Sequence, residues 1–211
     1  MGGYEWFAGL VTSRLSVPLS KVQLNTLYGH FETLMRWNQK LNLTSIRDPE
    51  EVVIRHYCEC LLFAAGLPAQ AGRSVVDVGS GAGFPGVPIA VLRSDCGVTL
   101  LESHRRKGVF LEESTRSIGN VSVSVARAEA IQDTFDWVVS RAVRAETVVS
   151  LIPTLGANIG LMISDVDYQR VRDTSVVWEK TDPIPWSQHQ LCAYGVSRGT
   201  STSEIPLRIS E

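Results

Sequence analysis

The fold class of this chain is decided by one segment, Val75-Val76-Asp77-Val78-Gly79-Ser80-Gly81-Ala82-Gly83-Phe84-Pro85-Gly86. Its apolar start is typical of a buried strand. The glycines that follow allow a tight turn and let the backbone approach a ligand without interference from side chains. Pro85 or Pro88 suits the start of a helix, where a backbone N–H is not needed. Such a strand-to-helix turn is the ligand-binding corner of a doubly wound α/β sheet, which we predict here.

Two classes of ligand fit a corner of this kind. Gly81, Gly83 and Gly86 match the G-x-G-x-x-G pattern that holds the pyrophosphate of a dinucleotide. However, Pro85 interrupts that match, and Asp77 stands just before the first glycine, where a carboxylate suits a cation better than a pyrophosphate. The order of acid and glycines resembles motif I of the S-adenosylmethionine-dependent methyltransferases, whose cofactor is cationic. We therefore predict S-adenosylmethionine as the cofactor, bound by Asp77, Gly79 and Gly81.

Composition sets limits on the protein class. The chain has 211 residues, 44% of them hydrophobic, and a net charge of −2. This length suits one α/β domain over residues 71–211 with an N-terminal helical cap over residues 1–70. The weak net charge means that any contact with nucleic acid needs a local basic patch.

The cysteines and the hydropathy pattern predict the compartment. The four cysteines show no metal-ligand spacing, so we expect reduced thiols and no metal site. We find neither an apolar run of 18 residues nor a signal-peptide pattern at the N-terminus. We therefore expect a cytoplasmic protein that does not contact the membrane.

Periodicity predicts helices first and alternating strands and helices afterwards. Three helices are expected over 4–16, 20–41 and 49–65. From Arg73 on, strands are predicted over 74–78, 97–102, 121–126, 135–140 and 158–164, with helices near 86–93, 104–118 and 144–152. This alternation predicts a mainly parallel, Rossmann-like sheet. Two further strands, 175–179 and 191–197, predict an antiparallel C-terminal edge, and we expect 165–190 to be partly loop.

Acidic residues after the next two strands extend the predicted cofactor site. Glu102 lies 19 residues after Gly83, where a carboxylate can accept hydrogen bonds from ribose hydroxyls. Ala128 and Glu129 follow the third strand, and we expect them beside the adenine. Phe84 is expected to pack against the methionine or adenosine part of the cofactor.

The residue that follows the fourth strand is Arg141. Its guanidinium stays protonated, so it cannot act as a base, but it can hold a phosphate, a carboxylate or a guanine edge. The alternative is a structural salt bridge with Glu129 or Asp136. We interpret His56, on a helix face, as structural. The run from His104 to Lys107 opens a helix with cations, which the helix dipole disfavours, so it invites an anionic partner.

Several blocks together identify a family. Arg36-Trp37-Asn38-Gln39-Lys40-Leu41-Asn42-Leu43-Thr44, Arg55-His56, the glycine segment, Ala128-Glu129 and Ser140-Arg141-Ala142 resemble ribosomal RNA small subunit methyltransferase G. The resemblance implies methylation of guanine N7 in 16S rRNA, free or in a precursor of the small ribosomal subunit. It also implies that Gly79, Phe84, Ala128, Glu129 and Arg141 contact S-adenosylmethionine. We further expect Arg141 to bridge the cofactor and the guanine, as the catalytic residue.

The chain also departs from the family pattern. Glu59 and Cys60 stand where the family commonly has Asp and Ser, and Ser164-Asp165 stands where it usually has Lys-Gly. The tail, Ile205–Glu211, is less basic than is usual. These changes leave two alternatives: a diverged methyltransferase for another RNA or a small molecule, or a non-catalytic nucleotide- or RNA-binding protein. We expect a monomer.

Overall fold

The computed structural model describes residues 3–68 and 74–198. The N-terminal part is helical, as predicted, with α1 (Tyr4–Arg14) and α2 (Lys21–Leu41). Ser20 starts α2 with a capping box: its hydroxyl accepts a hydrogen bond from Gln23 N, and the Gln23 side chain accepts one from Ser20 N.

The third predicted helix has an irregular centre. Asp48 caps α3 (Pro49–Val52), and the helix ends with α4 (Glu59–Gly66), as expected. Between them, however, lies a π-helical segment, η1 (Val53–Cys58). The prediction of one regular helix was wrong here, because π-helical turns are set by tertiary packing and often lie at functional sites.

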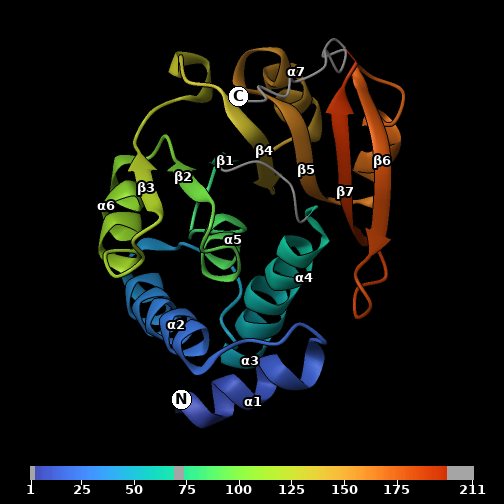
Figure 1. Cartoon of the computed structure of the whole chain (residues 1–211). Helices are drawn as coiled ribbons and strands as arrows, with labels where there is room; N and C mark the ends of the chain where they lie inside the picture. Colours follow the sequence, from blue (N-terminus) through green and yellow to red (C-terminus); the bar gives the residue numbers. More distant parts are fainter. Residues whose placement is uncertain (1–2, 69–73, 199–211) are drawn as a thin grey trace, which may run out of the picture.

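The sheet has the order β3-β2-β1-β4-β5-β7-β6 (Figure 1). The first five strands pair in parallel: β1 (Ser74–Val78), β2 (Gly97–Leu101), β3 (Val121–Ser124), β4 (Phe135–Arg141) and β5 (Gly156–Ser164). β7 (Gln190–Ser197) pairs antiparallel with β5 and with β6 (Val176–Pro183). This arrangement confirms the Rossmann-like sheet with an antiparallel C-terminal edge.

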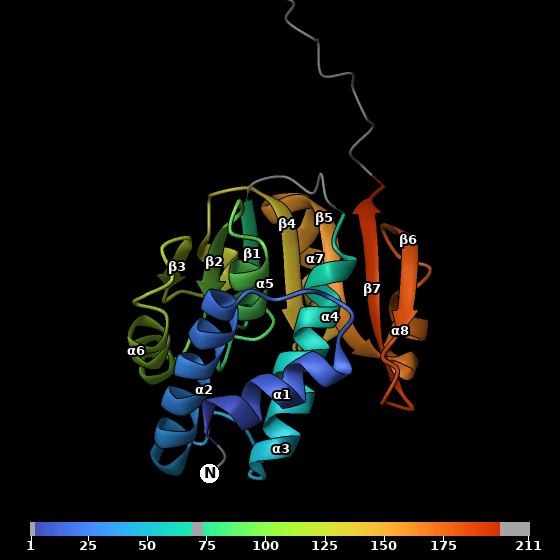
Figure 2. The same ribbon diagram turned by 60° about the horizontal axis from the view of Figure 1, so that its bottom comes forward.

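Helices cover both faces of the sheet (Figure 2). One face carries α5 (Gly86–Leu92), α4 and the N-terminal helices, with α6 (Arg105–Ser114) beside α2, and the other carries α7 (Ala145–Leu155) and α8 (Asp165–Val171). Each face has its own apolar core. The first core joins residues of α1, α2 and α4 to residues of the sheet, so the N-terminal helices and the strands share one apolar core.

The segment 165–190 is more ordered than expected, because it contains the whole of α8 and of β6. Ser164 caps α8 through its hydroxyl, which accepts a hydrogen bond from Asp167 N at 3.0 Å. The predicted domain boundary at residue 70 and the predictions for the tail fall outside the described residues. Within the described part of the chain, none of the helices combines the length and the hydropathy that a membrane span requires.

Candidate functional site

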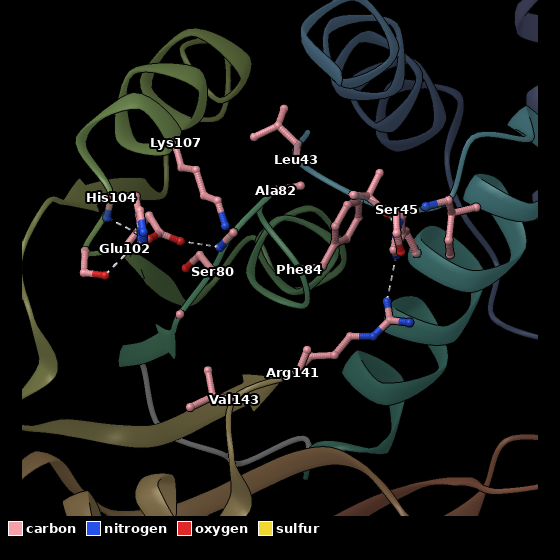
Figure 3. A pocket seen from close by; sticks show the side chains of 17 residues that line it. Leu43, Ser45, Ser80, Ala82, Phe84, Glu102, His104, Lys107, Arg141 and Val143 are labelled. Carbon is pink, nitrogen blue, oxygen red and sulfur yellow. Dashed lines mark hydrogen bonds and ion pairs between the residues drawn. The ribbon is translucent and has the colours of Figure 1, made fainter. Parts of the chain in front are cut away.

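A cavity of about 530 Å³ opens at the carboxyl ends of β1, β2 and β4 (Figure 3). The glycine loop after β1 forms its floor, and the segment from Leu43 to Ile46, after α2, forms part of its wall. Gly79, Gly81, Phe84, Glu102 and Arg141 all line it. The structure thus brings together these five predicted site residues, which come from distant parts of the chain.

The backbone of the loop requires glycine. Gly79 has a φ of +73° and Gly81 one of +56°, in the left-handed region that residues with a side chain rarely adopt. A Cβ atom on Gly79 would also lie 2.5 Å from the Val143 side chain. The loop is tied to β2, since Gly79 N and Ser80 N both donate hydrogen bonds to the Leu101 carbonyl.

Glu102 fixes the far side of the same loop. Its side chain is buried, and its two oxygens accept hydrogen bonds from Gly81 N at 3.0 Å and from His104 N at 2.8 Å. Each carboxylate oxygen has more than one lone-pair site, so Glu102 can still accept hydrogen bonds from hydroxyl groups in the cavity. This geometry agrees with the predicted ribose contact, which stays a prediction.

A smaller cavity of about 180 Å³ adjoins the first, with Gly79, Ser103 and Val143 lining both. Ala128 and Glu129 line this second cavity, in a 3₁₀ turn after β3. Apolar side chains from β1, β2 and α7 line it as well: Val78, Leu101 and Leu151. Its size and apolar lining suit a flat ring, as expected for an adenine.

Arg141 lies within a polar cluster at the end of β4. Its guanidinium donates to Glu59 Oε2 at 2.9 Å, to His56 Nδ1 at 3.0 Å and to Cys60 Sγ at 3.7 Å. The salt-bridge partner is therefore Glu59, and neither Glu129 nor Asp136, which were the predicted alternatives. Glu59 also forms an ion pair with Arg55 at 3.1 Å, while its own side chain is 1% exposed.

His56 belongs to the site, although we interpreted it as structural. It lines the main cavity and stacks on Phe84, with ring centroids 4.9 Å apart. Because Nδ1 accepts a hydrogen bond from Arg141, Nε2 carries the proton and donates to Thr44 Oγ1 at 2.8 Å. Burial and the neighbouring Arg141 lower the pKa of His56 to about 3, so its ring is neutral at physiological pH.

Asp77 lies below the glycine loop and is fully buried. Its Oδ2 accepts a hydrogen bond from Gly86 N at 2.9 Å, at the start of α5. Burial raises the pKa of Asp77 to about 7. Its side chain is not among the residues that line the two cavities, so the predicted contact with a cation has no counterpart in their walls.

A third cavity, of about 370 Å³, lies beyond Arg141. It shares Arg141, Ala142 and Val143 with the main cavity, and further cations line it: Arg55, Arg144 and Arg170. Ala142 has a φ of +63°, an unusual conformation for a residue other than glycine that often marks functional sites. Across residues 3–68 and 74–198, no group of three or more His, Cys, Asp or Glu side chains is arranged to hold a metal ion.

Comparison with known proteins agrees with this geometry. The model of the family "rRNA small subunit methyltransferase G" matches residues 23–163. The ribosomal RNA small subunit methyltransferase G of Nitrosomonas europaea is 42% identical over 137 residues, which are 63% of this chain and 63% of that protein. The protein of the same name from Clostridium beijerinckii is 34% identical over 176 residues, 77% of this chain and 74% of that protein.

Solved structures share the fold at low sequence identity. A SAM-dependent methyltransferase from Aquifex aeolicus has a TM-score of 0.57 at 15% identity, covering 74% of this chain and 97% of its own. A magnesium protoporphyrin IX methyltransferase from Synechocystis has a TM-score of 0.56 at 12% identity, covering 80% and 97%. On the extent of the family match, this chain belongs to the rRNA small subunit methyltransferase G family.

Proposed function

We propose that this protein transfers a methyl group from S-adenosylmethionine to N7 of a guanine in 16S rRNA. The observation that carries the proposal is the pair of adjoining cavities around the glycine loop, in a member of this family. The protein would act in the cytoplasm, as a monomer, on the rRNA or on a precursor of the small ribosomal subunit.

The residues in the cavities fit this cofactor. Glu102 would accept hydrogen bonds from the ribose hydroxyls, and the smaller cavity beside Ala128 and Glu129 would take the adenine. The methionine end would then lie in the main cavity, towards Phe84 and Arg141. The combined site lies within the range of about 300–1,000 Å³ that is common for ligand pockets.

The reaction requires little from the side chains beyond the alignment of cofactor and guanine. When bound, the cofactor supplies a methyl group on a sulfonium sulfur, which the unprotonated N7 of guanine can attack without a general base. Arg141 lines both the main and the third cavity, so it can hold guanine and cofactor in register. Such alignment can lower a barrier by about 7–11 kcal/mol.

The third cavity is where we place the target nucleotide. Its arginines suit a phosphate, because a guanidinium forms bidentate hydrogen bonds with phosphate oxygens. Glu146, also in its lining, is exposed and offers an acceptor to the N–H groups of a guanine edge. Glu59 holds Arg141 at the boundary between the two cavities.

The proposal is tested in cells that lack this protein. Mass spectrometry of their 16S rRNA nucleosides should show one 7-methylguanosine fewer than the parent, restored by the wild-type chain and not by the Gly81→Val variant. An unchanged 7-methylguanosine content would contradict the proposal. Loss of a different methylated nucleoside would support the alternative of a diverged target.

A further inference from the structure

A groove of about 450 Å³ lies between α2 and α6, outside the three cavities described above. Six residues line it: Arg36, Trp37, Lys40, Leu41, Arg106 and Glu113. Four of the six belong to α2 and two to α6, and the two helices lie side by side (Figure 1).

The groove carries more cations than its one carboxylate can pair. Arg36 is paired with Glu113, which accepts its hydrogen bond at 2.6 Å. Lys40 and Arg106 are exposed, and neither forms an ion pair with any residue that the structure describes. Arg106 also lies in the first turn of α6, where the helix dipole disfavours a cation. An anionic partner would relieve both conditions.

An aromatic ring stands beside these cations in a fixed orientation. The indole N–H of Trp37 donates to Glu113 Oε1 at 3.1 Å, and the ring meets Phe110 edge to face at 5.9 Å. Glu113 therefore holds both Arg36 and Trp37 in place. Aromatic rings beside free cations are the combination with which proteins bind single-stranded nucleic acid, because bases contact the ring and phosphates the cations.

Residues that line the groove stand close in sequence to residues that line the main cavity. Leu41 lines the groove, and Leu43, two residues later, lines the cavity. Arg106 lines the groove, and its neighbour Lys107 lines the cavity. Figure 3 shows Leu43 and Lys107 on the same side of the cavity. The groove therefore lies near this side of the main cavity.

We propose that the α2–α6 groove binds a single-stranded stretch of the RNA substrate outside the cavity that takes the methylated nucleotide. Lys40 and Arg106 would contact its phosphates, and Trp37 would contact a base. The identity of the RNA rests on the proposed function; the contact itself is tested separately, by binding.

The experiment measures the affinity of the full chain for an in vitro transcript of 16S rRNA between about 50 and 200 mM salt. The variant Lys40→Gln/Arg106→Gln removes the two free cations of the groove. Its control, Lys21→Gln/Arg198→Gln, removes one lysine and one arginine that are exposed and lie elsewhere on the surface. Calorimetry with S-adenosylhomocysteine and melting curves accompany both variants.

The slope of log affinity against log salt should be shallower by roughly 1.4 in the groove variant, because each single-strand phosphate contact contributes about 0.7. The affinity of this variant at 0.1 M salt should fall roughly 10–30-fold. The control should stay near wild type, and S-adenosylhomocysteine should bind equally to all three proteins. Equal slopes in the groove and control variants would overturn the inference, as would a wild-type chain without salt-dependent RNA binding. Absence of methylation by the wild-type chain, with the slope difference intact, would instead contradict the proposed function.

Trp37 provides the second readout. Trp37→Leu should weaken RNA binding about tenfold with an unchanged salt slope, whereas Trp37→Phe, which retains an aromatic ring, should lose less. Equal losses in the two variants, at equal melting temperatures, would remove the base contact from the inference.

Discussion

The variant Arg141→Lys separates the geometry of the site from its charge. The guanidinium of Arg141 reaches Glu59 at 2.9 Å and His56 at 3.0 Å from its two terminal nitrogens. A lysine keeps the positive charge and can pair with Glu59, but it lacks the planar fork that serves both partners at once. Without the guanidinium, Nδ1 of His56 loses its hydrogen-bond donor.

The magnitude follows from the lost hydrogen bond. A hydrogen bond that involves a charged group contributes about 1.5–3 kcal/mol to stability. The Arg141 side chain is 17% exposed, so solvent screening reduces this value only slightly. For a chain of this length, 1 kcal/mol shifts the melting temperature by about 2–4 °C, which predicts a decrease of roughly 3–12 °C. Methyl transfer per folded molecule should decrease at least tenfold, because the cofactor and the guanine lose their common anchor.

The assay combines thermal unfolding with single-turnover methylation of 16S rRNA, for Arg141→Lys and for Arg116→Lys as the control. Arg116 is exposed, so its replacement should change neither quantity. An unchanged melting temperature for Arg141→Lys would show that the hydrogen bonds of the Glu59–Arg141–His56 cluster do not stabilise the fold. A lower melting temperature with normal turnover would show that Arg141 is structural and takes no part in the reaction.

Three further variants test the loop. Glu102→Ala should weaken S-adenosylhomocysteine binding roughly ten- to hundredfold in calorimetry, because hydrogen bonds to a charged group are lost; equal affinity would make Glu102 a purely structural acid. Gly81→Val should abolish that binding with a modest loss of stability. The φ of +56° at this position is strained for a β-branched residue, while an added Cβ would have no neighbour nearer than 3.8 Å. Normal binding would place the cofactor elsewhere. Asp77→Asn tests a pH effect. Folding raises the pKa of the Asp77 carboxyl from 3.8 to about 7, so the folded wild type binds this proton more tightly than the unfolded chain and loses stability as the pH rises through this window. Between pH 4 and 8 its free energy of unfolding should fall by about 2–4 kcal/mol relative to the variant, and parallel urea-unfolding profiles would contradict the raised pKa.

The sequence predicts the elements with strong local signals. The apolar run before Asp77 and the glycines after it specify a strand and a turn, and both lie where expected. The capping residues Ser20 and Asp48 likewise start the helices that they predict. Helix α8 was missed because its acids and the prolines downstream weaken every periodic signal, while its cap, Ser164, was considered only as a departure from the family pattern.

The partners of the site residues depend on tertiary structure. Arg141 meets Glu59, which lies 82 residues earlier in the chain, so no local pattern could connect them. Glu59 and Cys60, noted as departures from the family, both contact Arg141. The placement of Asp77 follows from strand alternation: Val76 and Val78 face the core under α7, so Asp77 faces α5 and meets Gly86 N.

Methyl transfer to guanine N7 can be measured with the purified chain, methyl-labelled S-adenosylmethionine and unmodified 16S rRNA, followed by mass spectrometry of the nucleosides. The label should appear in 7-methylguanosine, at a single position of the rRNA, and Gly81→Val should incorporate none. Label in any other nucleoside, or no transfer by a wild-type chain that binds S-adenosylhomocysteine, would contradict the proposed function.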